Sequence, residues 1–150
     1  MPIVTKKSDL FRDEQAGGEV LDAAKTKGRM FTAHGTATNA ADDLSGSKYH
    51  LIDLPSGAIL DDRTAFDVEA TGFAAIRIGT KDDVDALVSQ TKATENIVTP
   101  LAFGDANHGK ALWEILGMAE DPGGFIGLYQ HAIANATGAG TMLFRISWNA

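Results

Sequence analysis

The sequence predicts a mainly β protein: an antiparallel β-sandwich or jelly-roll-like body with one short helix and an extended N-terminal arm. Short runs rich in β-branched and aromatic residues recur at spacings close to the roughly 8–12 residues typical of sandwiches and barrels. Clusters of glycine, proline, asparagine and aspartate separate these runs, and the 150-residue chain contains 16 glycines. The runs do not alternate with regular helices, which argues against a parallel α/β sheet.

Length and composition fit one globular domain with a core of its own. Apolar residues make up 44% of the chain and charged residues 22%. There is no cysteine, which excludes disulfides, thiolate catalysis and cysteine-ligated zinc. The formal net charge of -7 argues against nucleic acid or an anionic membrane as the main partner, because both attract clustered Lys and Arg. We expect neither a membrane-spanning segment nor a secretory signal, because the long apolar run that each requires is missing.

We divide the chain into an N-terminal arm, residues 1–28, and a β-sandwich domain, residues 29–150. The arm is mostly polar, and Gly17-Gly18 breaks any helix within it. Its apolar residues form two small pairs, which we expect to anchor the arm on a neighbouring surface. A frayed terminus is the alternative. The candidate interface residues of the arm are Ile3, Val4, Leu10 and Phe11.

The first part of the domain predicts two strands and a turn. Residues 30–38, which are rich in threonine, and residues 48–54 both fit β-strands. Pro55-Ser56-Gly57 ends the second strand, because proline presets φ and glycine permits a positive φ. The chain becomes extended again at residues 58–60.

Two hairpins are predicted from alternating patterns. Residues 64–70 alternate between apolar and acidic positions, and Thr71-Gly72 then separates them from a strand over residues 73–79. The second hairpin joins residues 125–134 to residues 141–148 through a glycine-rich turn.

The segment between the hairpins is less regular. Residues 81–88 fit a helical turn or more, because their apolar residues share one stripe. Residues 95–103 fit a short strand, which Pro100 restricts to a sheet edge. Residues 110–117 form the best short helix, with Gly117 placed to end it. The expected core consists of Phe31, Phe66, Val68, Ile76, Ile78, Leu116, Phe144, Ile146 and Trp148.

No pattern of catalytic or metal-binding residues stands out. The four histidines lack the spacing of a metal pair, and the acidic pairs, Asp61-Asp62 among them, lack the pattern of a calcium loop. Neither a Gly-x-Ser-x-Gly elbow nor a phosphate-binding loop is present. We therefore expect no enzymatic activity and no cofactor. A small hydrolase whose acids meet only in space is a minor alternative.

Six stretches of the domain, taken in order, form a distinctive series of strand and turn motifs. They are Phe31-Thr32-Ala33-His34-Gly35-Thr36, the run from Tyr49 to Ile59, Ile76-Arg77-Ile78-Gly79, Leu112-Trp113-Glu114-Ile115-Leu116-Gly117, Asp121-Pro122-Gly123, and the run from Ala136 to Thr141. This series resembles small virion proteins of tailed bacteriophages, namely head decoration (cement) and minor capsid structural proteins.

The resemblance implies a β-sandwich or jelly-roll-like body on the outside of a capsid, where it would contact the major capsid protein and cement the shell. It also implies a homo-oligomer at a lattice symmetry axis, with a trimer favoured, and it supplies no catalytic residue. Two alternatives stay open. One is a structural protein of the tail or neck, and the other is a carbohydrate-binding sandwich that uses Trp113, Tyr49 or Tyr129.

Overall fold

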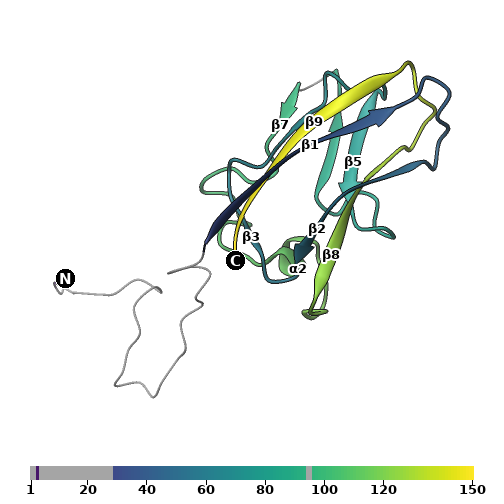
Figure 1. Cartoon of the computed structure of the whole chain (residues 1–150). Helices are drawn as coiled ribbons and strands as arrows, with labels where there is room; N and C mark the ends of the chain where they lie inside the picture. Colours follow the sequence, from purple (N-terminus) through teal and green to yellow (C-terminus); the bar gives the residue numbers. More distant parts are fainter. Residues whose placement is uncertain (1–2, 4–28, 94–95) are drawn as a thin grey trace.

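The computed structural model describes Ile3, residues 29–93 and residues 96–150. Two antiparallel sheets pack face to face, and a single turn of helix, α2 (Leu112–Ile115), lies at one end of the sandwich (Figure 1). One sheet has the order β1 (Met30–Asn39), β9 (Gly140–Asn149), β4 (Ala65–Asp67) and β7 (Ile97–Val98), with β3 (Ile59–Leu60) also paired to β9. The other has the order β2 (Lys48–Pro55), β8 (Phe125–His131), β5 (Ala75–Gly79) and β6 (Val88–Thr91). The predicted antiparallel sandwich with one short helix is confirmed.

The strand pairs are nested along the chain. The first strand, β1, pairs with the last, β9, over its full ten residues, and the two run side by side in Figure 1. Inside that pair, β2 pairs with β8, β4 with β7, and β5 with β6. Most contacts that hold the sandwich together therefore join residues far apart in the sequence.

Both predicted hairpins are wrong. The strand at residues 64–70 becomes β4 in one sheet, whereas the strand at 73–79 becomes β5 in the other. Residues 125–134 and 141–148 are divided in the same way between β8 and β9. Alternation predicts which side of a strand is buried, but any half-buried strand satisfies it, so it does not select the hydrogen-bonded partner. The connections cross between the sheets instead of reversing within one.

The predicted helical turn over residues 81–88 is also wrong. Leu87 donates its backbone N–H to Ile78 at 2.9 Å, and Val88 begins strand β6, which forms a true hairpin with β5. Val84 is exposed, so no apolar stripe is buried there. The short edge strand predicted near Pro100 is present as β7.

The helix predicted over residues 110–117 is present as α2. Gly117 follows it with a φ of 76°, a left-handed conformation that favours glycine and ends helices. Leu112 donates its N–H to Ala58 at 2.8 Å, and Trp113 donates its N–H to Ser56 at 3.2 Å. These bonds fix α2 on the turn that follows β2.

The side chains of the two sheets meet in one core. Seven of the nine expected core residues are buried there, and Trp148 is half-buried against it. Phe31 lies outside the core with 42% of its surface exposed. It stacks on Trp148 with ring centroids 5.6 Å apart, but β1 is an edge strand and no further strand covers its other side. The buried seven are Phe66, Val68, Ile76, Ile78, Leu116, Phe144 and Ile146.

Candidate interaction surfaces

Two of the four histidines, His50 and His131, are held by contacts of their rings with neighbouring groups. His50 lies 2.7 Å from the Asp53 carboxylate and stacks on Tyr129, with ring centroids 4.4 Å apart. His131 is buried and donates a ring N–H to the Thr80 carbonyl at 2.7 Å. Among residues 29–93 and 96–150, no three His, Asp or Glu side chains come together as metal ligands. No helix in the described part of the chain is long and apolar enough to cross a membrane.

The aromatic residues considered for sugar binding do not form a platform. Tyr49 on β2 is the cross-strand partner of Gln130 on β8, whose buried side chain faces inward. The Tyr49 hydroxyl is hydrogen-bonded to Asp43. Tyr129 is on the opposite face of that sheet, where His50 covers one side of its ring. Trp113 is half-buried against the core from α2. The structure therefore does not bring these three rings together.

Two ionisable side chains have shifted pKa values: Tyr49 on strand β2, and Asp121 in the loop before β8. Burial, followed by the hydrogen bond to the Asp43 carboxylate and its negative charge, raises the pKa of Tyr49 to about 12. Hydrogen bonds from the Ser56 side chain and from the Gly123 backbone lower the pKa of Asp121. Both groups tie a connection to the body of the sandwich, which is a structural role.

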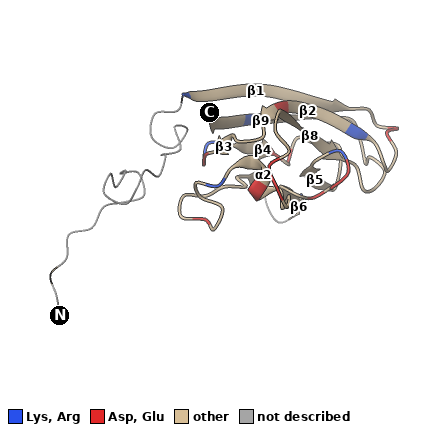
Figure 2. Ribbon diagram, turned by 90° about the horizontal axis from the view of Figure 1, so that it is seen from below, with Lys and Arg blue, Asp and Glu red and all other residues tan. Residues whose placement is uncertain are grey.

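The free edge of β1 is the least protected edge of the two sheets. Its ten residues include no Lys, Arg, Asp, Glu or Pro, and its register with β9 contains no bulge. The ribbon of β1 is accordingly uncoloured by charge along its length (Figure 2). Natural proteins shield exposed edges with charges, prolines, bulges or very short strands, because a bare edge pairs with other chains.

The other three edges carry such protection. Strand β2 contains Lys48, Asp53 and a bulge between His50 and Ile52. Strands β6 and β7 have only four and two residues. The β1 edge is thus the one described edge at which another extended segment meets no built-in obstacle.

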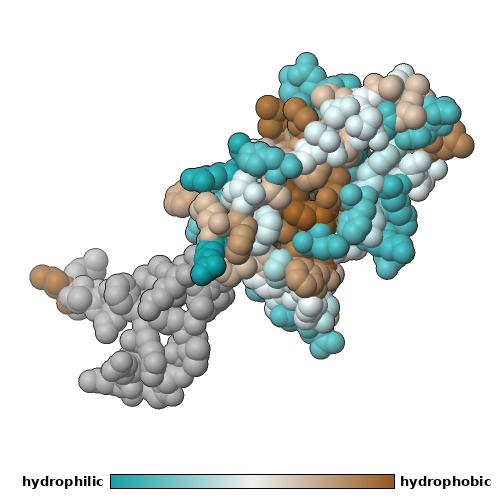
Figure 3. Space-filling view, viewed as in Figure 1, coloured by the Kyte–Doolittle hydropathy of each residue, from teal (hydrophilic) through white to brown (hydrophobic). Residues whose placement is uncertain are grey.

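Apolar surface accompanies the bare edge. The inward side of β1 carries small residues, and Gly35 lies so close to Phe144 that a Cβ there would be 2.4 Å from the ring. Half-buried side chains, including Leu51 and Ile52 of β2, pack against the core nearby. A hydrophobic band is visible between β1 and β2 in the space-filling view (Figure 3). The seam between the two sheets is therefore partly open on this side.

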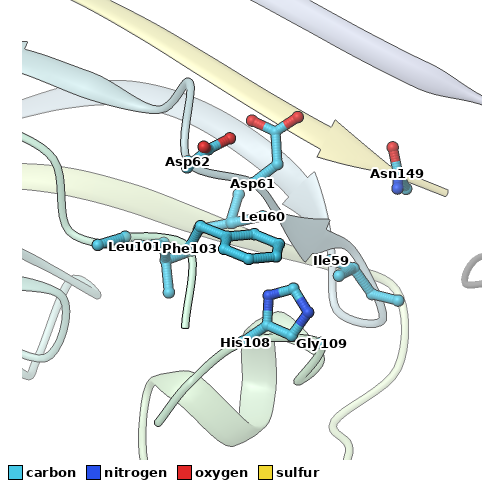
Figure 4. A pocket seen from close by; sticks show the side chains of 10 residues that line it. Ile59, Leu60, Asp61, Asp62, Leu101, Phe103, His108, Gly109 and Asn149 are labelled. Atoms are coloured by element: carbon cyan, nitrogen blue, oxygen red, sulfur yellow. The ribbon is translucent and has the colours of Figure 1, made fainter. Parts of the chain in front are cut away.

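A pocket of about 430 Å³ lies where β9 ends. Buried Ile59, Leu60 and Leu101 provide apolar walls. Phe103 also lines the pocket although 84% of its surface is exposed, and its ring meets His108 edge-on with centroids 5.4 Å apart (Figure 4). The sequence pattern gave no sign of this pocket, because its walls come from separate segments.

Two aspartates stand at the rim of the pocket, and no Lys or Arg lines it. The Asp61 carboxylate accepts hydrogen bonds from the Arg63 N–H at 2.9 Å and from the Ser147 hydroxyl at 3.1 Å. Asp62 is exposed and has no hydrogen bond or ion pair with any residue in the described ranges. The pocket therefore combines apolar walls with one unengaged negative charge.

The N-terminal segment joins the sandwich beside this pocket. Arg29 and Ala150 exchange backbone hydrogen bonds of 3.1 and 3.0 Å, and the pocket residue Asn149 pairs with both Met30 and Ile59. Of the candidate arm residues, Ile3 is fully exposed. Val4, Leu10 and Phe11 lie outside the described residues.

Comparison with known proteins finds a likeness in structure. No protein-family model matches the chain, and no curated protein matches it in sequence. The fold is similar to that of a chain in a solved structure described as the capsid asymmetric unit of cyanophage Pam1, with a TM-score of 0.54 and 14% sequence identity. The alignment covers 98% of this chain and 99% of that chain. The two chains thus share a fold over nearly their whole lengths.

Proposed function

We propose that this protein is a non-enzymatic structural protein of a bacteriophage virion, which binds the outside of the capsid and cements it through protein–protein contacts. The observation that carries the proposal is the fold shared, end to end, with a chain of a cyanophage capsid asymmetric unit. Because a fold alone does not determine function, the proposal also draws on the bare edge of β1 and on the apolar seam between β1 and β2.

The nested strand pairs support this assignment. Leaving out the two-residue β3, the eight strands pair first with last, second with next to last, and so on inward. We interpret this connectivity as a jelly roll, an architecture that recurs in viral capsid and lectin domains.

The β1 edge and the adjacent apolar seam are the proposed contact surface. An exposed sheet edge can accept an extended segment of a partner, with backbone hydrogen bonds supplying affinity and alternate side chains supplying specificity. We propose the major capsid protein as the partner, and a homo-oligomer, with a trimer favoured, as the decorating unit.

Cementing follows from mass action. A protein that binds only the assembled shell, across the boundaries between its subunits, stabilises that assembled state. A standard interface buries about 1,600 Å² in total. Many copies on one shell then oppose the internal pressure of packaged DNA together.

The test compares particles that contain the full-length protein with particles in which residues 2–20 are deleted. We expect mass spectrometry to detect the full-length protein in purified particles, and we expect the deletion to weaken its retention and lower the temperature at which particles lose their DNA. Absence of the protein from purified virions would contradict the proposal. Unchanged retention and heat resistance after the deletion would refute the expectation that the arm anchors the protein on a neighbouring surface.

A further inference from the structure

We propose that the pocket lined by Phe103 and His108 receives the Leu10-Phe11-Arg12 segment from the arm of a second copy of this chain. The inference rests on the homo-oligomer in the proposed function and adds to it a specific acceptor site. In that site one copy supplies the walls and the other supplies the side chain that fills them.

The pocket is suited to an aromatic side chain. A volume of about 430 Å³ exceeds the space of a single water, and buried aliphatic residues form its floor. Phe103 offers a ring that is 84% exposed, and in the close view this ring lies between the aspartates on one side and His108 on the other (Figure 4). Covering such a ring with Phe11 removes apolar area from water and adds an aromatic pair.

One charge of the segment, Arg12, complements the negative rim of the pocket. Arg12 directly follows Phe11, and acidic Asp9, Asp13 and Glu14 flank this segment, so Arg12 is the residue that would face the rim. Asp62 at the rim has no partner among the described residues, and no Lys or Arg lines the pocket. A guanidinium beside the seated Phe11 can form a charge-assisted, bidentate pair with that carboxylate. The Phe11-Arg12 pair would therefore supply a ring to cover Phe103 and a positive charge to pair with Asp62.

The position of the pocket is compatible with exchange between copies. The chain leaves the sandwich at Arg29, beside Asn149 of the pocket. When two copies meet at this face, each copy therefore has its arm exit and its pocket at the contact. The extended chain from Phe11 to Arg29 reaches at most roughly 60 Å, which spans such a contact. Each copy would give one arm and accept one, so the assembly closes on itself.

Site-directed cross-linking tests the exchange directly, because the natural chain has no cysteine. An Asp13→Cys variant is mixed with a differently tagged Ala102→Cys variant, and a short bismaleimide is added. We expect a heterodimer that carries both tags. Ser89→Cys, on the exposed face of β6 and away from the pocket, is the matched control and should give only background cross-linking. Heterodimer yields no higher than this control would overturn the proposal.

A chain that carries both Asp13→Cys and Ala102→Cys, and that cross-links only within its own monomer, would equally overturn the exchange. Phe11→Ser and Phe103→Ser should each reduce heterodimer formation at least about tenfold, the effect of losing a central aromatic anchor. Arg12→Glu should also reduce it, and Asp62→Arg in the accepting copy should restore it. Unchanged yields in the two serine variants would contradict the assigned contact.

These measurements use purified full-length protein in the absence of capsids. Failure of the cross-link with normal incorporation into virions would remove the arm–pocket contact and leave the proposed function standing. A positive cross-link in a protein that is absent from virions would support the arm–pocket contact and contradict the proposed function.

Discussion

Asn39 links the two sheets through its side chain. Its Nδ2 donates to the Gly138 carbonyl at 2.9 Å, and its Oδ1 accepts the Gly72 N–H at 3.0 Å. A Cβ on Gly72 would lie 2.0 Å from the Gly138 carbonyl oxygen. The connection from β4 to β5 and the connection from β8 to β9 thus touch through their backbones. Only glycine fits at position 72, because any side chain there would clash with the Gly138 carbonyl.

Gly72→Ala should therefore destabilise the protein by about 3 kcal/mol, because backbone atoms cannot move aside as a flexible side chain can. Gly57→Ala is the matched control, since its Cβ would meet nothing within 4 Å, and it should change stability by less than about 0.5 kcal/mol. Urea unfolding followed by circular dichroism measures both. Equal stability of the two variants would contradict the close contact assigned to Gly72.

Tyr49 makes a pH-dependent contribution to stability. Its hydrogen bond to Asp43 requires the protonated phenol, whose pKa is raised from 10.0 to about 12 in the folded protein. The contribution is fully present below pH 10 and is lost as the pH rises toward 12, because the unfolded chain deprotonates first.

Tyr49→Phe should lower the free energy of unfolding by about 1 kcal/mol at pH 7. The deficit should shrink between about pH 10 and pH 12, since only the wild-type protein loses stability through this phenol. Unfolding curves at neutral and alkaline pH measure the difference. A deficit that grows with pH would show that the hydrogen bond does not hold the phenol protonated.

At the scale of the element, β1 is the strand whose free edge is open to another chain. Thr36 is exposed on its outward side. Thr36→Lys adds the charge that natural edge strands use to prevent pairing. It should weaken binding to capsids that lack the protein at least about tenfold, while leaving thermal unfolding nearly unchanged.

Ser89→Lys, an equivalent change on the short edge strand β6, is the control and should bind like the wild type. Titration of purified variants onto depleted capsids gives both affinities. Equal binding by the two lysine variants would exclude the β1 edge from the interface.

The elements illustrate what a sequence can predict here. Alternation identified most strands, because the burial of Phe66, Ile76 and Ile146 leaves a period of two in the sequence. Strand partners depend on which of several similar faces meet across the sandwich, and alternation is the same for each of them. For that reason the strands were predicted while both hairpins were wrong.

The candidate surfaces were predictable to a smaller extent. The bare edge of β1 is a property of ten consecutive residues, but it becomes an edge only through the pairing of β1 with β9. In the sequence, Asp61-Asp62 lacks the pattern of a calcium loop, and Phe103 falls at the end of a predicted edge strand. Their meeting with Ile59 and His108 at one pocket depends on the nested topology, which local patterns do not determine.

At the scale of the whole molecule, the fold persists where sequence similarity does not. The cyanophage capsid chain has the same architecture at 14% identity over nearly the full length of both chains. Cores accept many apolar substitutions when volume and pattern are kept. The likeness between the two chains is therefore one of fold.

The central claim, that the protein occupies the outside of a phage capsid, is tested most directly by cryo-electron microscopy of intact particles. We expect density for the two-sheet body on the outer surface, at a symmetry axis of the lattice, with the β1 edge against a neighbouring subunit. Particles in which the body is missing from the head, or is found only in the tail or neck, would contradict the account.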